Sequence, residues 1–173
     1  MKISFTFATL SSFVLLFSRF TDAFTTRPSF ASNMRNRSLT KVYLFDFLNE
    51  GKKALVKKLA GDYDQSAVQS RLDGLVADNP VLMLSFTTCP FCVKAKEVLD
   101  ARSAKYTVVE LDKDPEGKAI RAVMGDVYGR TSVPAVWIGG SFVGGCNDGP
   151  MGGVVKLSES GELDKMLKGV GAV

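Results

Sequence analysis

Residues 81–92 read Val-Leu-Met-Leu-Ser-Phe-Thr-Thr-Cys-Pro-Phe-Cys, an apolar run that leads into two closely spaced cysteines. The run over 81–86 is typical of a short buried strand. After Cys92, apolar residues recur among charged ones as they do on an amphipathic helix. Pro90 would take the first helical position, where its missing N–H is not needed. We therefore predict a strand, a turn and a helix that begins at the two thiols.

The predicted helix start favours reactive thiol chemistry. Cys89 would be the N-cap residue, so its sulfur would accept hydrogen bonds from the free N–H groups of the first turn. Those donors and the helix dipole favour the thiolate, which is the reactive form of cysteine. The chain has no histidine, so activation depends on the helix N-terminus and on nearby cations. The pattern predicts a redox site.

Other uses of a Cys-x-x-Cys pair fit less well. A structural zinc ion needs four ligands, whereas the chain has no histidine and only one further cysteine, Cys146. We therefore expect no metal. A structural disulfide between Cys89 and Cys92 would close a very short loop and would restrict the unfolded chain little. Two inert buried cysteines would leave the proline at the helix start without a purpose.

The first 41 residues have the composition of targeting sequences. Lys2, the apolar stretch 5–17 and Thr21-Asp22-Ala23 match the three regions of a signal peptide, which we assign to residues 1–23. Residues 24–41 are rich in Ser, Thr and Arg and lack acidic residues, as transit peptides do. A retained anchor, or secretion with 24–41 as the mature N-terminus, is the alternative.

The junction Ala23-Phe24 resembles the bipartite plastid presequences of diatoms and related algae with complex plastids. That resemblance implies the plastid (chloroplast) stroma as the location, with secretion or the endoplasmic reticulum as the alternative. Removal of residues 1–41 takes away six of the 22 basic residues and one of the 18 acidic ones, which leaves 16 and 17. The mature chain is thus about neutral, and we expect no nucleic-acid partner and no stable membrane insertion.

The remaining residues suffice for one compact domain. We interpret residues 42–63 as an N-terminal extension, with a lysine-rich amphipathic helix that packs on the domain, is tethered to it or lies on a membrane surface. The domain itself spans 64–171. Its expected elements are a helix over 64–78, a strand over 81–86, a helix from Pro90, a strand over 105–111, a helix capped by Asp114 with Pro115 first, strands over 134–138 and 141–143, and one or two C-terminal helices.

This order, α-β-α-β-α-β-β-α, indicates an α/β protein. The β-α-β crossover makes its two strands parallel, and Gly139-Gly140 predicts a hairpin between the last two strands. A Cys-x-x-Cys pair at a strand–helix junction then indicates a thioredoxin-like fold, a four-stranded mixed sheet flanked by helices.

Three motifs over residues 66–170 resemble a dithiol glutaredoxin. They are Cys89-Pro90-Phe91-Cys92, Arg130-Thr131-Ser132-Val133-Pro134 and Gly144-Gly145-Cys146-Asn147-Asp148. The resemblance implies a monomeric glutathione-dependent thiol-disulfide oxidoreductase, with glutathione as co-substrate and glutathionylated proteins as partners. Cys89 would be the catalytic nucleophile and Cys92 the resolving thiol. It also leaves open a dimer that carries a [2Fe–2S] cluster through Cys89 and glutathione, which Pro90 disfavours.

The resemblance implies a glutathione site as well. Val133 would offer its main chain ahead of a cis Pro134, and the amides of Cys146 and Asn147 would begin a helix and meet the γ-glutamyl carboxylate. Arg121 would meet the glycine carboxylate, or else be an exposed helix charge. We read Cys146 as a small loop residue, with a regulatory thiol as the alternative. The full expected set is Phe91, Arg121, Ser132, Val133, Pro134, Gly145, Cys146 and Asn147.

The sequence departs from that family pattern at three places. Phe86 stands where a lysine is usual, three residues before the first cysteine. Phe91 replaces the usual tyrosine and so lacks its hydroxyl, and Asn147 replaces a common Asp, Ser or Thr. The missing lysine implies weaker glutathione binding or a smaller thiolate fraction at Cys89.

Overall fold

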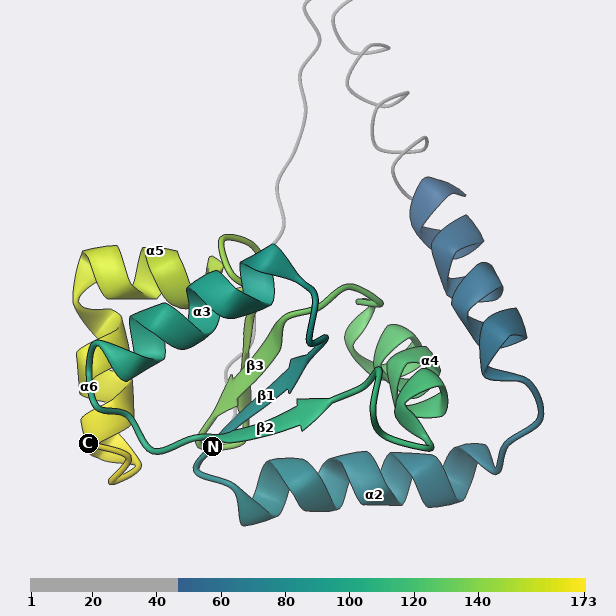
Figure 1. The fold of residues 1–173 in the computed structure, drawn as a ribbon, viewed down its shortest axis with the longest axis horizontal. Coiled ribbons are helices and arrows are strands. Elements are labelled where there is room, and N and C mark those ends of the chain that lie inside the picture. Colours follow the sequence, from purple (N-terminus) through teal and green to yellow (C-terminus); the bar gives the residue numbers. More distant parts are fainter. Residues whose placement is uncertain (1–46) are drawn as a thin grey trace, which may run out of the picture. The chain divides into compact units, whose positions relative to one another are not determined.

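The computed structural model describes residues 47–173. The predicted signal peptide, the transit-peptide-like segment and the first part of the extension lie outside the described residues. Residues 47–60 form an N-terminal helix. It is followed by α2 (Gln65–Asp78), β1 (Val81–Ser85), α3 (Pro90–Asp100), β2 (Thr107–Glu110), α4 (Gly117–Tyr128), β3 (Ala135–Ile138), β4 (Ser141–Gly144), α5 (Gly153–Ser160) and α6 (Glu162–Gly169) (Figure 1).

The four strands form one mixed sheet in the order β2-β1-β3-β4. β1 and β2 are parallel, whereas β3 is antiparallel to both β1 and β4. Gly139 and Gly140 both have positive φ, +55° and +76°, as a two-residue hairpin turn requires. The sheet, its parallel crossover and its final hairpin confirm the predicted thioredoxin-like fold.

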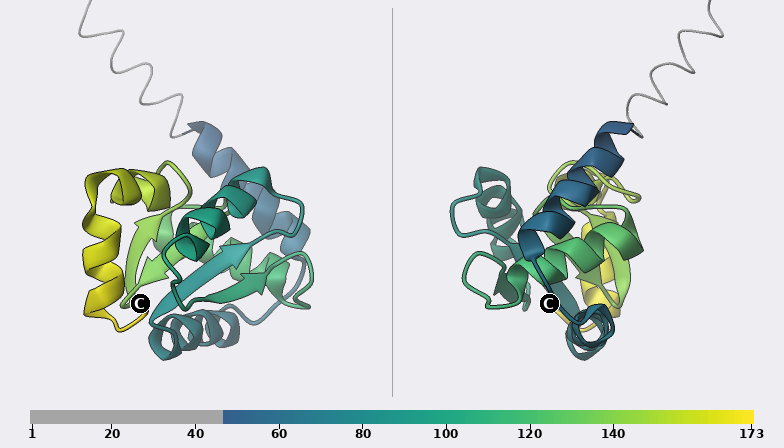
Figure 2. Two further views of the ribbon diagram at one scale, coloured as in Figure 1. Left: turned by 60° about the vertical axis from the view of Figure 1, so that its left-hand side comes forward. Right: turned by 90° about the vertical axis from the view of Figure 1, so that its right-hand side faces the viewer.

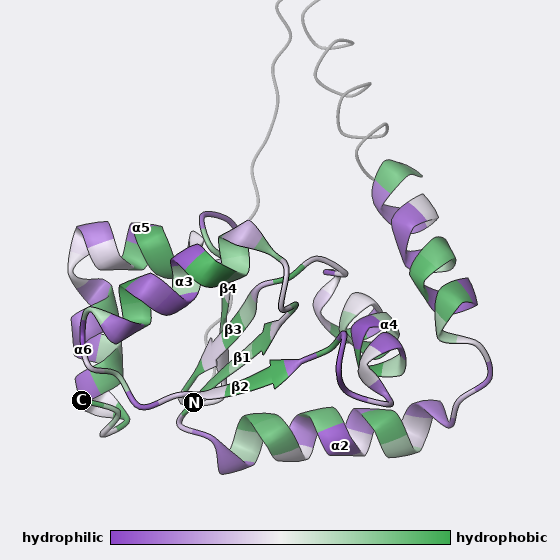
Figure 3. Ribbon diagram, in the orientation of Figure 1, coloured by the Kyte–Doolittle hydropathy of each residue, from purple (hydrophilic) through white to green (hydrophobic). Residues whose placement is uncertain are grey.

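Helices cover both faces of the sheet. α3, α5 and α6 pack on one face, where Met83 and Val136 meet Leu99 of α3. α2 and α4 pack on the other, where Leu84 and Trp137 join the second cluster. Figure 2 shows these two layers from two further directions. In Figure 3, hydrophobic and hydrophilic residues alternate along α2, as expected of a helix with one face against a sheet.

The start of α4 was wrongly predicted. The helix begins at Gly117, after the N-cap residue Glu116, and no side chain caps it. Asp114 instead receives two hydrogen bonds from the guanidinium of Arg71 in α2, one of them 2.9 Å long, and one from the N–H of Glu116. A Cβ at Gly117 would lie 2.0 Å from the carbonyl oxygen of Leu111, so the backbone passes too close there for any other residue.

The N-terminal helix packs on α4. Val56 is only 6% exposed, the Lys57 ammonium lies 2.9 Å from the Asp126 carboxylate of α4, and the Asn49 side chain donates to the Gly129 carbonyl at 3.4 Å. Three leucines of the helix, Leu48, Leu55 and Leu59, remain exposed. Within residues 47–173, no helix is long and apolar enough to cross a membrane.

Candidate functional site

The two cysteines of residues 89–92 lie where the sequence predicts them, at the start of α3. Cys89 is the N-cap residue and Pro90 is in the first turn. The Cys89 carbonyl accepts from the N–H groups of Cys92 and Val93, at 3.0 and 3.1 Å. The sulfur of Cys89, however, makes no capping hydrogen bond. The thiol donates instead to the Val133 carbonyl oxygen, 3.9 Å away, so the prediction of a sulfur cap was wrong. A protonated thiol is a donor, and Val133 is the acceptor it reaches.

The two thiols differ in environment. Cys89 is partly exposed, whereas Cys92 is fully buried among core residues. Burial raises the pKa of Cys92 to about 11, because the thiolate would lose its solvation there. Both cysteines, and Cys146, are free thiols. Of these three thiols, Cys89 is the one that is open to an incoming disulfide.

Asp112 fixes the turn that leads to Cys89. Its carboxylate accepts from the Thr87 backbone N–H at 3.0 Å and also from the Thr87 hydroxyl. These hydrogen bonds lower the pKa of Asp112, and the one from the Thr87 hydroxyl has the larger effect. The Cys89 N–H in turn donates to the Phe86 carbonyl at 3.1 Å. Sequence reasoning missed Asp112, because its contact with Thr87 spans 25 residues.

The loop that contains Val133 and Pro134 faces the Cys89 thiol. The Val133–Pro134 peptide bond is cis, as the resemblance implied. A groove of about 280 Å³ runs along this loop. It brings together six of the eight expected glutathione-contacting residues, namely Phe91, Ser132, Val133, Pro134, Cys146 and Asn147, and adds Arg130 and Asp148.

Arg130 ties the two loops of the groove to each other. Its guanidinium pairs with the Asp148 carboxylate at 2.7 and 3.0 Å. It also donates to the carbonyls of Ser132, at 3.0 Å, and Pro134, at 3.3 Å. A Cβ at Gly145 would lie 2.2 Å from this guanidinium, so a larger residue there would have to displace the Arg130–Asp148 pair. Both charged residues stand inside the quoted motifs, but only the fold shows that they pair.

The loop after Gly145 does not begin a helix at Cys146 and Asn147, contrary to expectation. α5 starts at Gly153. The main-chain carbonyls of Gly145 and Cys146 instead accept from the first N–H groups of α5, at 3.0 and 2.9 Å. Gly153, the first residue of α5, has φ +80°. Cys146 is 3% exposed, and burial raises the pKa of its thiol.

Arg121 lies outside the groove and is not an exposed charge. It is partly buried, and burial lowers the pKa of its guanidinium. Its Nε donates to the Thr131 carbonyl at 2.6 Å, and its guanidinium carbon sits 5.3 Å from the centre of the Phe86 ring. The residue that replaces the usual lysine thus stacks against a cation. Sequence reasoning noted each residue but not their contact.

Comparison with known proteins fits this geometry. The glutaredoxin family model matches residues 81–143. Glutaredoxin-1 of Rhizophagus irregularis is 35% identical over 102 residues, 59% of this chain and 96% of the relative. The chain belongs to the glutaredoxin family. Membership implies a glutathione-dependent thiol oxidoreductase.

Other glutaredoxins resemble the chain over the same region. The chloroplastic glutaredoxin-C4 of Oryza sativa subsp. japonica is 35% identical over 99 residues, 57% of this chain and 71% of the relative. The crystal structure of a buckwheat glutaredoxin–glutathione complex superimposes with a TM-score of 0.59 at 33% identity, covering 63% of this chain and 94% of that one. Oxidized glutaredoxin 2 from Chlamydomonas reinhardtii gives 0.58 at 36% identity, with coverages of 64% and 100%.

Proposed function

We propose that this glutaredoxin reduces protein–glutathione mixed disulfides and small disulfides, with Cys89 as the nucleophile. The observation that carries the proposal is the contrast between the two thiols: Cys89 is open at a helix start, and Cys92 is buried beneath it with a pKa raised to about 11. A thiol that stays protonated does not compete for the first attack.

The reaction is two successive exchanges. The Cys89 thiolate attacks the glutathione sulfur of the mixed disulfide, the substrate S–S bond breaks, and the protein thiolate leaves and takes up a proton. Cys89 is then bonded to glutathione. A second glutathione thiolate attacks the glutathione sulfur of that bond, which frees Cys89 and forms glutathione disulfide. Two glutathione thiols thereby supply the two electrons that reduce each substrate.

Cys92 provides the other route to release glutathione. Its sulfur attacks Cys89, glutathione leaves as the thiol, and an intramolecular disulfide forms. A buried thiol can do this only after it loses its proton, so its raised pKa slows the step. We assign Cys92 to this slower resolving step and to the reduction of small disulfides.

The groove beside Pro134 is the place for glutathione. In this pose the main chain of Val133 pairs with the cysteinyl part of the ligand, since extended backbones pair through their N–H and C=O groups. Phe91 forms a wall, and Ser132, together with Gly145, Cys146 and Asn147 from the loop after β4, surrounds the γ-glutamyl end. We propose that Arg121, which lies outside this groove on the Phe86 ring, meets the glycine carboxylate at the other end of the ligand.

The test compares the wild type with Cys89→Ser and Cys92→Ser in a mixed-disulfide assay with glutathione as reductant. Cys89→Ser should lose activity entirely. Cys92→Ser should keep activity on glutathionylated peptide, because the second glutathione can still resolve the intermediate. Activity that survives in Cys89→Ser would overturn the assignment of the nucleophile.

The location proposal concerns the presequence. Residues 1–23 act as a signal peptide and 24–41 as a transit peptide, residues 42–63 form the extension of a 64–171 glutaredoxin domain, and the mature monomer resides in the plastid stroma. The chloroplastic rice relative supports this location. Mass spectrometry of the endogenous N-terminus tests it, since a start at Phe24 would point to secretion.

The [2Fe–2S] alternative rests on family resemblance alone, and absorbance after anaerobic reconstitution tests it.

A further inference from the structure

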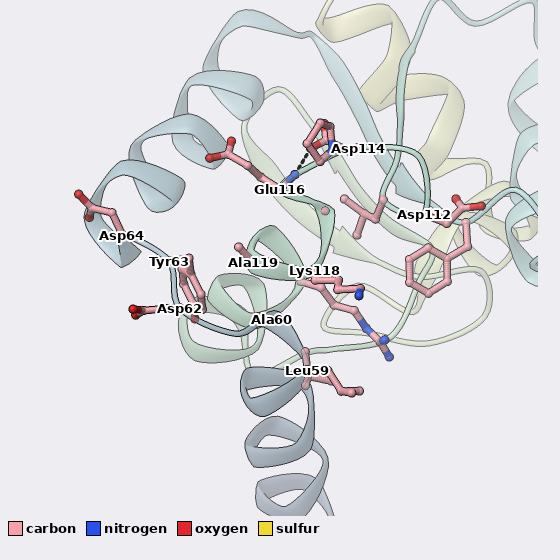
Figure 4. Close-up of a pocket in the computed structure, with 16 residues that line it drawn as sticks. Leu59, Ala60, Asp62, Tyr63, Asp64, Asp112, Asp114, Glu116, Lys118 and Ala119 are labelled. Atoms are coloured by element: carbon pink, nitrogen blue, oxygen red, sulfur yellow. Dashed lines mark hydrogen bonds between the residues drawn. The ribbon is translucent and has the colours of Figure 1, made fainter.

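A cavity of about 760 Å³ lies away from the groove along the Val133–Pro134 loop. One wall comes from Leu59 and Ala60, at the end of the N-terminal helix, and from Tyr63 in the segment that follows (Figure 4). The opposite wall is the turn before α4, from Asp112 to Glu116, with the first residues of that helix. The cavity is within the size range of protein ligand sites.

The cavity depends on the extension that precedes the glutaredoxin core. The matched family region covers residues 81–143, so Leu59, Ala60 and Tyr63 come from outside it. The N-terminal helix is held in place by the burial of Val56 and by the Lys57–Asp126 ion pair at 2.9 Å. These contacts give the cavity a fixed wall.

The walls are acidic. Five carboxylates line the cavity, against the cations of Lys118 and Arg121. Arg71 pairs with two of the five, Asp114 and Glu116, at 2.5 and 2.7 Å, and its single positive charge leaves that group with one net negative charge. The other three have no cationic partner within residues 47–173: Asp62, Asp64, which caps α2, and Asp112, which holds Thr87. The carboxylates outnumber the cations, so the cavity favours a cation over an anion.

The walls also offer apolar and aromatic surface. Leu59 and the rings of Tyr63 and Phe86 line the cavity, and aromatic faces attract ammonium and guanidinium groups. The Tyr63 hydroxyl is buried and has no hydrogen-bond partner among the described residues, so the ring of Tyr63, and not its hydroxyl, is the part that a ligand would contact. Lysine and arginine side chains combine an apolar stem with a charged head, which matches this surface.

The cavity adjoins the catalytic turn. Phe86 and Asp112 belong to its wall. The Phe86 carbonyl accepts from the Cys89 N–H, and Asp112 holds Thr87. A peptide seated in the cavity would therefore continue past the residues that position Cys89.

We propose that this cavity docks a basic segment of the glutathionylated target protein, with lysine or arginine side chains among the carboxylates. The docking site selects targets in which a basic stretch accompanies the modified cysteine. The inference rests on the proposed deglutathionylating function and names a substrate class for it.

The experiment uses two measurements on the full chain. The first is fluorescence anisotropy with a labelled cysteine-free lysine-rich peptide and with its glutamate counterpart. The second is kcat/KM for glutathionylated peptides in which a lysine or a glutamate run stands at increasing distances from the cysteine. Both preferences should favour the lysine peptides by about fivefold or more, and about 0.5 M NaCl should weaken them.

Two pairs of variants separate the cavity from general charge. Asp62→Lys should abolish the preference, whereas Asp73→Lys, an equal charge change on α2 outside the cavity lining, should keep it. Leu59→Lys should act like Asp62→Lys. Leu55→Lys is its control, because Leu55 is 58% exposed and Leu59 59%, and only Leu59 lines the cavity.

Activity with a small glutathione mixed disulfide should be unchanged in all four variants. Equal binding of lysine and glutamate peptides, or equal losses in Asp73→Lys and Asp62→Lys, would overturn the docking site. If small-substrate activity is intact, that result leaves the proposed function standing. Absence of activity with every mixed disulfide would instead refute the proposed function, while lysine-peptide binding lost only in the cavity variants would still support the site.

Discussion

Replacement of Arg121 by methionine should weaken binding of glutathionylated substrate with little change in kcat. The guanidinium is held by the hydrogen bond to the Thr131 carbonyl at 2.6 Å and by the Phe86 ring at 5.3 Å. Methionine keeps much of the apolar stem but removes the charge. Loss of one charge-assisted contact to a carboxylate, about 1.5 kcal/mol or more, corresponds to a KM about tenfold higher.

The part played by Phe86 can be isolated by a double-mutant cycle. A cation over an aromatic ring contributes about 0.5–1 kcal/mol where it is not desolvated, so Phe86→Leu should raise KM about twofold to fivefold. If Phe86 acts through Arg121, the two substitutions together should cost little more than Arg121→Met alone, with a coupling of about 0.5 kcal/mol or more. Lys118→Met is the control, because it removes a neighbouring exposed cation that no aromatic ring holds.

The assay is steady-state kinetics with a glutathionylated peptide at saturating glutathione, with unfolding by urea measured in parallel. An unchanged KM in Arg121→Met would refute the glycine-carboxylate role. Equal KM increases in Arg121→Met and Lys118→Met would mean that only the general charge matters. Strictly additive effects of Phe86→Leu and Arg121→Met would refute the stack as the route by which Phe86 acts.

Three further predictions follow from the same structure. In Cys89→Ser, alkylation of Cys92 should be slow near neutral pH and rise with pH, because burial, the largest cause, still raises its pKa after the contribution of Cys89 is removed; a rate that levels off below pH 9 would contradict the effect of burial. Gly117→Ala should lower the free energy of unfolding by about 2–4 kcal/mol, since its Cβ would meet a carbonyl oxygen at 2.0 Å. Gly74→Ala in α2, with nothing within 4 Å, should raise it by about 0.5–1 kcal/mol in the same urea titration. Asp112→Asn should lower kcat more than it raises KM, because it loosens the turn before Cys89; the reverse pattern would place Asp112 in binding.

The Phe86–Arg121 stack changes what the missing lysine means. From the sequence, Phe86 is a lost cation and predicts a weaker site. In the structure its ring supports Arg121 instead. A positive charge therefore stands next to the residue that occupies the lysine's place. A lysine introduced at 86 would remove the stack and repel Arg121, so the family pattern cannot be restored by that single change.

The N-terminal extension is the other feature that sets this chain apart. Its helix has a buried side against α4 and adds one wall of the acidic cavity. The glutathione groove is built from different loops. Glutathione chemistry and target selection would thus occupy neighbouring surfaces that share Phe86 and Arg121.

Local patterns were sufficient for the order of elements and for the place of the thiols. Val81–Ser85, Pro90 and Gly139-Gly140 each depend on neighbours a few residues away, because strand burial, helix starts and tight turns are decided by short-range sterics and hydrogen bonds. The prediction of the start of α4 was wrong for the opposite reason. Asp114 fits a helix cap by its local sequence, but its carboxylate binds Arg71, which lies 43 residues away in the chain.

By itself, the sequence determined the thioredoxin-like fold, the dithiol at a helix start and, through three motifs, the kinship with glutaredoxins. Tertiary structure alone decided which thiol is buried, where the Cys89 sulfur points, what Arg121 rests on and where the acidic cavity lies. Each of these depends on contacts between residues far apart in the chain, such as Cys89 with Val133 and Thr87 with Asp112. Solvation and long-range pairing are properties of the packed molecule, and no local pattern encodes them.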